Sequence, residues 1–294
     1  MQAAPGAARS EPQASGVTMQ AAPGAARSEP EASGVTSMDA YLVEVFSSVQ
    51  GEGPELGTST LFVRFAECDL RCAWCDTPQS WRRGPRCRLE LERGSARFEE
   101  RDNPLPIGAL VAACERLELE RHRWVSLTGG EPLLQPEAAL ETARALRGRG
   151  PRIWLESHGL EAGALARLLP LVDSVSMDWK LASDVRRASE GKRGPVAPYH
   201  EAHETFLAVA RAAPLVVVKI VVTTASEDAE IDEAVMRVAR THPAACLVLQ
   251  PVTPFAAVKE RPSAARMLAL ERRASERLAD VRVIPQTHKL LGAL

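Results

Sequence analysis

The sequence lacks the features that would place this protein on nucleic acid, in a membrane or outside the cell. Lys and Arg total 36 against 38 Asp and Glu, for a formal net charge of −2, so the chain has no excess of the clustered cations that bind phosphate. No apolar run reaches the ~18 residues that a membrane helix needs, and the best one, Leu215–Val222, is interrupted by Lys219. No signal peptide, with a basic and then an apolar region, opens the chain. We therefore expect a cytoplasmic protein that binds neither nucleic acid nor a membrane.

Cysteine is too scarce for a disulfide framework, and it is unevenly placed. The chain has six cysteines in 294 residues, whereas disulfide frameworks belong to short secreted chains. In a reducing compartment, a tight group of cysteines indicates a metal site. Three of the six fall within eight residues and the other three are scattered: Cys68, Cys72 and Cys75 against Cys87, Cys114 and Cys246.

The first 36 residues repeat one 18-residue unit that contains almost no large apolar side chains. The unit that ends at Thr18 returns nearly unchanged up to Thr36. Two copies are too few for a solenoid, which needs about three repeats to close a core, and this composition cannot bury enough surface to offset the chain entropy. We predict a disordered tail over residues 1–37, with Met38 as an alternative start, followed by one domain over residues 38–294.

From Tyr41 onward, short β-branched or apolar runs alternate with longer helical patterns, which is typical of parallel strands joined by helices. About eight strands can close or nearly close a barrel, whose active face lies at the carboxyl ends of its strands. We therefore predict an α/β fold with a partial or modified TIM-like (β/α) barrel. Residues 78–104, rich in Arg and Glu, fit no element and are predicted to form an irregular insertion. The expected strands are Tyr41–Phe46, Thr60–Ala66, Trp124–Thr128, Ile153–Glu156, Ser174–Met177, Leu215–Val222, Cys246–Gln250 and Val281–Ile284, and the expected helices are Ile107–Glu120, Pro136–Arg149, Ala162–Leu169, Glu201–Ala213, Asp228–Arg240 and Pro262–Leu278.

The strongest chemical signal is a CxxxCxxC motif, formed by Cys68, Cys72 and Cys75. Three thiolates so close together need an acceptor of soft ligands, and zinc and iron–sulfur clusters are the two candidates. A structural zinc requires a fourth ligand, for which Cys87 is available after an Arg-rich linker. Three cysteines without a fourth suit a four-iron cluster that keeps one iron open for a non-protein ligand.

CxxxCxxC early in a predicted β/α barrel resembles the signature of the radical S-adenosylmethionine (SAM) enzymes. A second motif, the Gly-Gly-Glu-Pro that follows Thr128, resembles the element that borders the methionine group of SAM in that superfamily, and its glycines allow a close backbone approach. The resemblance implies a 4Fe–4S cluster whose open iron binds SAM, and cleavage of SAM to a 5′-deoxyadenosyl radical by chemistry that belongs to the cofactor.

Three further strings narrow the resemblance: Gln50-Gly-Glu-Gly53, Cys75-Asp-Thr77 and Gln286-Thr-His-Lys289. Together they resemble the 7-carboxy-7-deazaguanine synthase family. Membership would imply conversion of 6-carboxy-5,6,7,8-tetrahydropterin to 7-carboxy-7-deazaguanine, with loss of ammonia and re-formation of SAM, in queuosine-type deazapurine biosynthesis. It would also imply Mg²⁺, an electron donor such as a flavodoxin, and a homodimer.

The resemblance assigns roles to individual residues. Glu156 at a strand end would accept the adjacent N–H donors of the pterin edge, and Arg64 and His288 would face the substrate carboxylate. Arg64 stands where a core residue is expected, and a charge pointing into a barrel requires a partner. The cluster ligands are Cys68, Cys72 and Cys75, with Thr77 for Mg²⁺; the SAM contacts are Trp74, Cys75, Asp76, Gly130, Ser176, Asp178, Lys180, Gln250, Pro251, Val252 and Thr253; the substrate contacts are Val49, Gln50, Gly51, Glu52, Arg64, Thr128, Glu156, His288 and Leu294.

Two alternatives remain open at this point: another radical SAM enzyme, such as a glycyl-radical activase, and a zinc-stabilised binding protein that uses Cys87 as its fourth ligand. One departure from the family is His158, where some members carry Asn, and we expect it to support the site from behind. The remaining histidines fall in helical or loop stretches and are expected at the surface: His122, His200, His203 and His242.

Overall fold

The computed structural model describes residues 38–191, 194, 196–255 and 257–292. The predicted tail over residues 1–37 and the terminal Leu294 lie outside the described residues. The main feature is a ten-stranded sheet with the order β14-β13-β12-β10-β9-β8-β3-β2-β5-β6. All neighbouring pairs from β3 to β14 are parallel, whereas β2 is antiparallel to β3 and β6 is antiparallel to β5. In sheet order the strands are β14 (Val281–Val283), β13 (Cys246–Pro251), β12 (Leu215–Val222), β10 (Ser174–Asp178), β9 (Arg152–Ser157), β8 (Trp124–Gly129), β3 (Ser59–Phe65), β2 (Leu42–Val49), β5 (Arg86–Glu90) and β6 (Phe98–Asp102).

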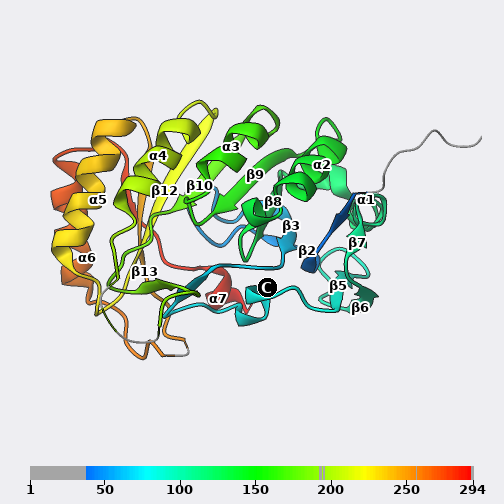
Figure 1. The fold of residues 1–294 in the computed structure, drawn as a ribbon, viewed down its shortest axis with the longest axis horizontal. Helices are drawn as coiled ribbons and strands as arrows, with labels where there is room; N and C mark the ends of the chain where they lie inside the picture. Colours follow the sequence, from blue (N-terminus) through cyan, green and yellow to red (C-terminus); the bar gives the residue numbers. More distant parts are fainter. Residues whose placement is uncertain (1–37, 192–193, 195, 256, 293–294) are drawn as a thin grey trace, which may run out of the picture. The chain divides into compact units, whose positions relative to one another are not determined.

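Helices alternate with the parallel strands, and each of the first five contacts the next helix in the chain. Figure 1 shows α2 to α6 following one another along one side of the curved sheet, with α7 on the other side. Two small ribbons complete the described structure, one formed by β1 (Asp39–Ala40) with β7 (Leu105–Pro106) and one by β4 (Leu70–Cys72) with β11 (Val185–Arg187). The helices are α1 (Ile107–Arg116), α2 (Pro136–Leu146), α3 (Ala162–Leu168), α4 (His200–Ala210), α5 (Asp228–Thr241), α6 (Ala264–Ser275) and α7 (His288–Leu291).

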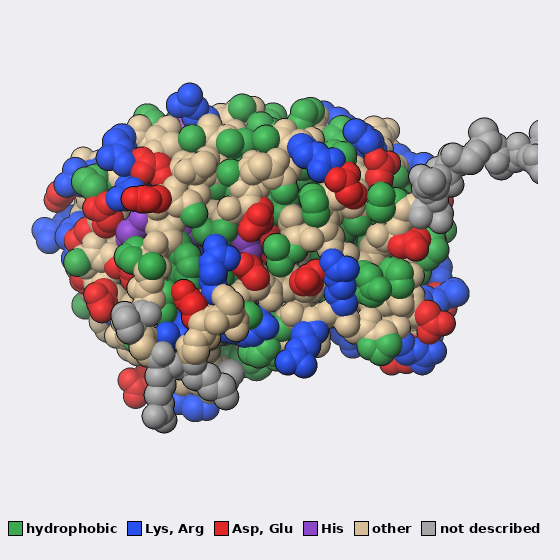
Figure 2. Space-filling model, in the orientation of Figure 1, with side chains coloured by type: hydrophobic (Ala, Val, Ile, Leu, Met, Phe, Trp, Pro, Cys, Tyr) green, Lys and Arg blue, Asp and Glu red, His purple; other side chains and the backbone are tan. Residues whose placement is uncertain are grey.

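The prediction of an α/β fold with a partial barrel is confirmed. All eight expected strands and all six expected helices are present, with ends that differ by a few residues. Among the described residues, the edge strands β14 and β6 each pair with one neighbour only, so the sheet curves without closing. None of the described helices is both long and apolar enough to cross a membrane, and basic and acidic side chains are interspersed over the face shown in Figure 2.

The prediction of an irregular insertion over residues 78–104 is wrong. β5 pairs in parallel with β2, and β6 pairs with β5, so this segment extends the main sheet by two strands. In β5 the buried Cys87 and Leu89 alternate with the exposed Arg86 and Arg88, which is the period of a strand with one buried face. The many charged residues obscured this alternation, because they occupy the exposed positions of a two-stranded edge.

The surface location expected for three histidines is also wrong. His122, His200 and His203 are all buried, with His203 fully so. Each is paired: the Nε2 atom of His122 lies 2.8 Å from the Ser47 hydroxyl, Nδ1 of His200 accepts from the Trp179 indole N–H at 3.0 Å, and the ring of His203 hydrogen-bonds the backbone at both nitrogens. A helical pattern cannot distinguish a solvated histidine from one that satisfies buried backbone groups in another element.

Candidate active site

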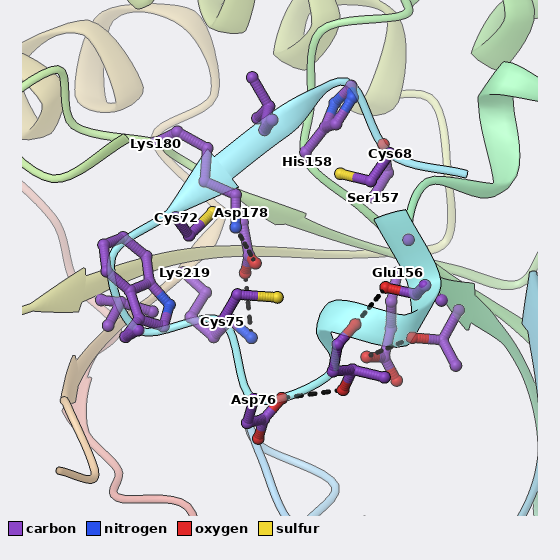
Figure 3. A pocket seen from close by; sticks show the side chains of 18 of the residues that line it. Cys68, Cys72, Cys75, Asp76, Glu156, Ser157, His158, Asp178, Lys180 and Lys219 are labelled. Carbon is purple, nitrogen blue, oxygen red and sulfur yellow. Dashed lines mark hydrogen bonds and ion pairs between the residues drawn. The ribbon is translucent and has the colours of Figure 1, made fainter. Parts of the chain in front are cut away.

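The cysteine motif lies on a loop that backbone pairing fixes from both sides. β4 pairs with β11, where Cys72 is opposite Val185, and the Ala73 N–H donates to the Asp184 carbonyl at 3.1 Å. All three motif cysteines are free thiols. They line one cleft of about 970 Å³ at the carboxyl ends of the parallel strands, and Figure 3 shows their sulfur atoms around this cleft.

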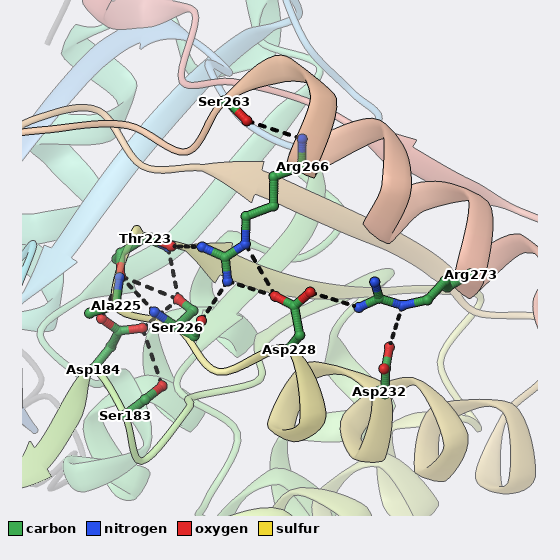
Figure 4. A network of polar contacts seen from close by, with 10 residues as sticks. All are labelled: Ser183, Asp184, Thr223, Ala225, Ser226, Asp228, Asp232, Ser263, Arg266 and Arg273. Carbon is green, nitrogen blue, oxygen red and sulfur yellow. Dashed lines mark hydrogen bonds and ion pairs between the residues drawn. The ribbon is translucent and has the colours of Figure 1, made fainter.

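A polar network, drawn in Figure 4, holds Asp184, whose carbonyl pairs with the cysteine loop. The buried carboxylate of Asp184 accepts hydrogen bonds from the hydroxyls of Thr223 at 2.7 Å and Ser226 at 2.5 Å. Arg266 of α6 joins the network by donating to the Thr223 carbonyl at 2.8 Å and to Asp228 of α5 at 2.7 Å. The strand that borders the cysteine loop is thus tied to two helices of the outer layer.

The chemistry of these thiols fits a cationic metal cluster. Burial raises the pKa of the Cys68 thiol to about 12 and that of Cys72 to about 11, so without a metal these thiols stay protonated at neutral pH. A bound metal supplies the positive charge that stabilises thiolates. Cys87 does not join them, because its side chain is buried in the main hydrophobic core on β5. The zinc site with Cys87 as fourth ligand is therefore wrong.

The turn formed by the Gly-Gly-Glu-Pro motif accepts only glycine at its first two positions. A Cβ on Gly129 would lie 2.2 Å from the Phe65 carbonyl oxygen, and one on Gly130 would lie 2.2 Å from that of Glu67. Both glycines line the cleft through their backbone. The buried Glu131 carboxylate points away and ties the turn to the end of β9, because it accepts from the backbone N–H of His158 at 2.6 Å and the hydroxyl of Ser157 at 3.0 Å.

Most residues predicted to bind SAM line the same cleft, on the side of β10, β13 and the cysteine loop: Trp74, Cys75, Asp76, Gly130, Ser176, Asp178, Lys180 and Gln250. The Lys180 ammonium lies 5.7 Å from the centre of the Trp74 ring. The Oε1 atom of Gln250 is buried and has no hydrogen-bond partner among the described residues, as expected where a ligand donor completes the site. The cleft does not reach the three residues after Gln250, which are Pro251, Val252 and Thr253.

Glu156 stands at the centre of the predicted substrate side. Its Oε1 atom accepts from Gln50 Nε2 at 3.0 Å and from the Ser126 hydroxyl at 2.7 Å, and its Oε2 atom accepts from the Thr128 hydroxyl at 3.3 Å. Two of these donors are on β8 and the third directly follows β2, and together they hold the carboxylate in one orientation. Glu156 and Thr128 line both the cleft and a second cavity of about 900 Å³.

The second cavity brings together the other predicted substrate contacts, which include Val49, Gln50, Gly51, Glu52, Arg64 and His288. Arg64 has the partner that its position required, because its Nε–H donates to Glu44 at 2.9 Å. The ring of His288 packs directly against Gly51, where a Cβ would lie 2.1 Å from His288 Nδ1. The Gln-Gly-Glu-Gly and Gln-Thr-His-Lys strings, more than 230 residues apart, therefore meet, with the Thr287 N–H donating to the Gly51 carbonyl at 2.9 Å.

Thr77, the predicted Mg²⁺ ligand, lies where the two cavities meet. Its hydroxyl donates to Asp76 at 2.9 Å, and the other Asp76 oxygen pairs with Lys289 at 2.7 Å. Burial raises the pKa of Asp76, but the hydrogen bond and charge of Lys289 outweigh it, so the net shift is downward. The C-terminal segment is thus tied to the cysteine loop by an ion pair.

His158 lines the cleft, although we expected it behind the site, and it also links the cysteine loop to a neighbouring turn. Its side chain is buried, and its Nε2 atom lies 3.0 Å from Asp69, which stands between Cys68 and Cys72 in the sequence. Burial lowers the pKa of His158, but the carboxylates of Glu131 and Asp69 outweigh it and raise the pKa overall. The imidazole therefore bridges the cysteine loop to the turn that contains Glu131.

Sequence reasoning missed several side chains that line the cleft, and the charged one among them is Lys219. Its ammonium contacts Glu52 directly and lies 3.0 Å from Asp178. The available signal was a single lysine in the middle of an eight-residue apolar strand, which requires a buried partner.

Comparison with known proteins agrees with this geometry. Residues 63–238 match the model of the radical SAM superfamily. The chain therefore belongs to the radical SAM superfamily.

The narrower family follows from whole-length relatives. The chain is 36% identical over 259 residues to 7-carboxy-7-deazaguanine synthase of Geobacter sulfurreducens, covering 87% of this chain and 98% of that protein. It is 30% identical over 272 residues to the enzyme of that name from Thermococcus kodakarensis, covering 87% of this chain and all of the relative. The fold is similar to that of QueE from Escherichia coli, with a TM-score of 0.54 at 22% identity over 83% of this chain and 93% of that one. The protein belongs to the 7-carboxy-7-deazaguanine synthase family.

Proposed function

We propose that this protein converts 6-carboxy-5,6,7,8-tetrahydropterin to 7-carboxy-7-deazaguanine with loss of ammonia, as a step of queuosine-type deazapurine biosynthesis. The observation that carries the proposal is the junction of two cavities at Glu156. Three thiols that fit a cluster line one cavity, and a carboxylate held by three donors faces both. A flat ring with adjacent N–H donors, seated at this carboxylate, would lie beside the cysteine cleft.

The cluster would be held by Cys68, Cys72 and Cys75, and SAM by the residues around Lys180 and Gln250. When bound, the cluster and SAM supply the 5′-deoxyadenosyl radical. The protein itself binds SAM and the substrate, orients them and shields them from solvent. Gly130 lines the cleft through its backbone, and the unpartnered Gln250 oxygen is available to a ligand donor.

The substrate would be oriented by complementary charge at its two ends. Glu156 accepts the N–H edge of the pterin, and Arg64 with His288 faces its carboxylate. The Nε–H of Arg64 is used by Glu44, so the terminal nitrogens of the guanidinium are the groups that would make a bidentate contact with a carboxylate. The terminal Leu294 remains a predicted contact.

Mg²⁺ would bind at Thr77 and complete its shell with water and substrate oxygens, because Mg²⁺ prefers oxygen ligands and retains water. We also propose that the enzyme is a cytoplasmic homodimer reduced by a flavodoxin-type donor. The glycyl-radical activase alternative is set aside, because the Gln-Gly-Glu-Gly and Gln-Thr-His-Lys strings meet at the second cavity and would have no role in it.

The experiment is anaerobic turnover of the carboxy-tetrahydropterin by reconstituted enzyme with SAM, dithionite and Mg²⁺, with the product followed by chromatography and mass spectrometry. We expect product and ammonia in equal amounts and SAM in catalytic quantity. A protein that cleaves SAM reductively but leaves the pterin unchanged would contradict the proposed function.

A further inference from the structure

Four buried or half-buried charges of alternating sign form a row through the cleft: Glu52, Lys219, Asp178 and Lys180. Lys219 contacts Glu52 at one end and lies 3.0 Å from Asp178 at the other. Asp178 in turn pairs with Lys180 at 2.6 Å. The Lys219 side chain is only 11% exposed, and Figure 3 shows it directed toward Asp178.

The strand register places Lys219 at the centre of this row. In β12 the alternate residues Val218 and Ile220 face the main core, so Lys219 and Val221 face the cleft. Lys219 is opposite Asp178 in the pairing of β12 with β10, and the Trp179 N–H donates to the Lys219 carbonyl at 2.7 Å. An ammonium in this position is stable only because carboxylates flank it, since an unpaired buried charge is strongly destabilising.

The two ends of the row belong to different parts of the site. Glu52 lines both cavities, and its second oxygen accepts from Gln286 at 2.7 Å, beside the predicted substrate contacts. Lys180 lies over Trp74 in the cysteine loop. Burial lowers the pKa of Lys219, but Asp178 and Glu52 outweigh this and raise it overall, so the bridge is charged at neutral pH.

We propose that Lys219 is a positioning residue that couples binding at the substrate end of the row to binding at the SAM end. This inference rests on the proposed function. A ligand that fixes Glu52 also fixes Lys219, and through it Asp178 and Lys180, so the second ligand meets side chains that are already ordered. Loss of the ammonium leaves Glu52 and Asp178 as neighbouring carboxylates that repel each other. They would then separate or take up a proton, and the two ends would lose their connection.

The test measures binding without turnover. The affinity of reconstituted, unreduced enzyme for the carboxy-tetrahydropterin is determined by calorimetry with and without saturating SAM. For the wild type we expect SAM to tighten pterin binding by a factor in the range of roughly 5 to 150, typical of coupled sites. In Lys219→Met this factor should fall to about 1, whereas Lys219→Arg should retain most of it. Arg272→Met, an exposed position on α6, is the control and should match the wild type.

Turnover supplies a second readout. Lys219→Met should form several 5′-deoxyadenosine molecules per product, while the wild type forms few. A coupling factor and a product ratio unchanged in Lys219→Met would overturn the proposal. If this variant does not fold, Lys219→Gln, which keeps a donor in the cleft, gives the same decision. A wild-type enzyme that binds no pterin at all, with or without SAM, would instead contradict the proposed function.

Discussion

Replacing Glu156 with glutamine separates recognition of the substrate from the generation of the radical. The change keeps the shape of the side chain, removes its charge and turns one acceptor oxygen into an N–H₂ donor. The contacts inside the protein can adapt, because two of the three donors to Glu156 are the hydroxyls of Ser126 and Thr128, which can rotate and accept instead. We therefore expect an unchanged fold and a loss confined to the binding and turnover of the substrate.

The size of the effect follows from the two hydrogen bonds that the carboxylate would accept from the pterin edge. A hydrogen bond to a charged group contributes about 1.5–3 kcal/mol, and a buried donor left without an acceptor costs about 1–3 kcal/mol more. Glutamine loses one of the two bonds and faces a substrate N–H with its own donor, so the total loss is about 3–6 kcal/mol. At about 1.4 kcal/mol per tenfold change, kcat/KM should fall roughly 10²- to 10⁴-fold. Mismatched buried donors reach the upper part of this range in other enzymes.

The assay is anaerobic conversion of the carboxy-tetrahydropterin, with two controls. The visible spectrum of the iron–sulfur protein and the slow substrate-free cleavage of SAM should be retained, because Glu156 is not a cysteine-loop residue. Glu137→Gln, on the exposed surface of α2, should behave as wild type. Conversion by Glu156→Gln within threefold of wild type would refute the placement of the pterin, and loss of the cluster would show that Glu156 is structural.

Three further predictions concern the rest of the chain. Alanine at any one of the three motif cysteines should abolish cluster assembly, measured as bound iron, whereas Cys87→Ala should retain full iron and cost only stability; loss of iron in Cys87→Ala would contradict the three-ligand cluster. Deletion of residues 1–37 should leave turnover and the melting temperature nearly unchanged, and a large loss of either would assign the tail a role. His203 should make the fold sensitive to acid, because burial lowers its pKa to about 3 and the folded state keeps the imidazole neutral. The contribution of His203 to the free energy of unfolding is therefore fully present above the unfolded pKa of about 6.5. This contribution declines as the pH falls below that value. At pH 5.5 the free energy of unfolding of the wild type, measured with urea, should have fallen by about 1 kcal/mol more than that of His203→Asn. An equal pH dependence of the two proteins would contradict the assignment.

The sequence by itself determined what is encoded locally. The apolar and helical runs predicted every strand and helix of the parallel half of the sheet, because these patterns reflect burial of one face by near neighbours. The CxxxCxxC and Gly-Gly-Glu-Pro motifs are also local, since their spacing alone brings the three thiols onto one loop and the glycines to one turn. The cysteine cleft could therefore be predicted from short stretches of chain.

The tertiary structure alone decided everything that depends on contacts between distant segments. β5 became a sheet strand because β2 offered it an edge, and His203 is buried because its two nitrogens satisfy backbone groups of Gly159 and Lys180. Lys219 is part of the site for the same reason. In the sequence it interrupts an apolar strand, and only the register of β12 with β10 and the approach of Glu52 supply the two carboxylates that keep its charge in the cleft.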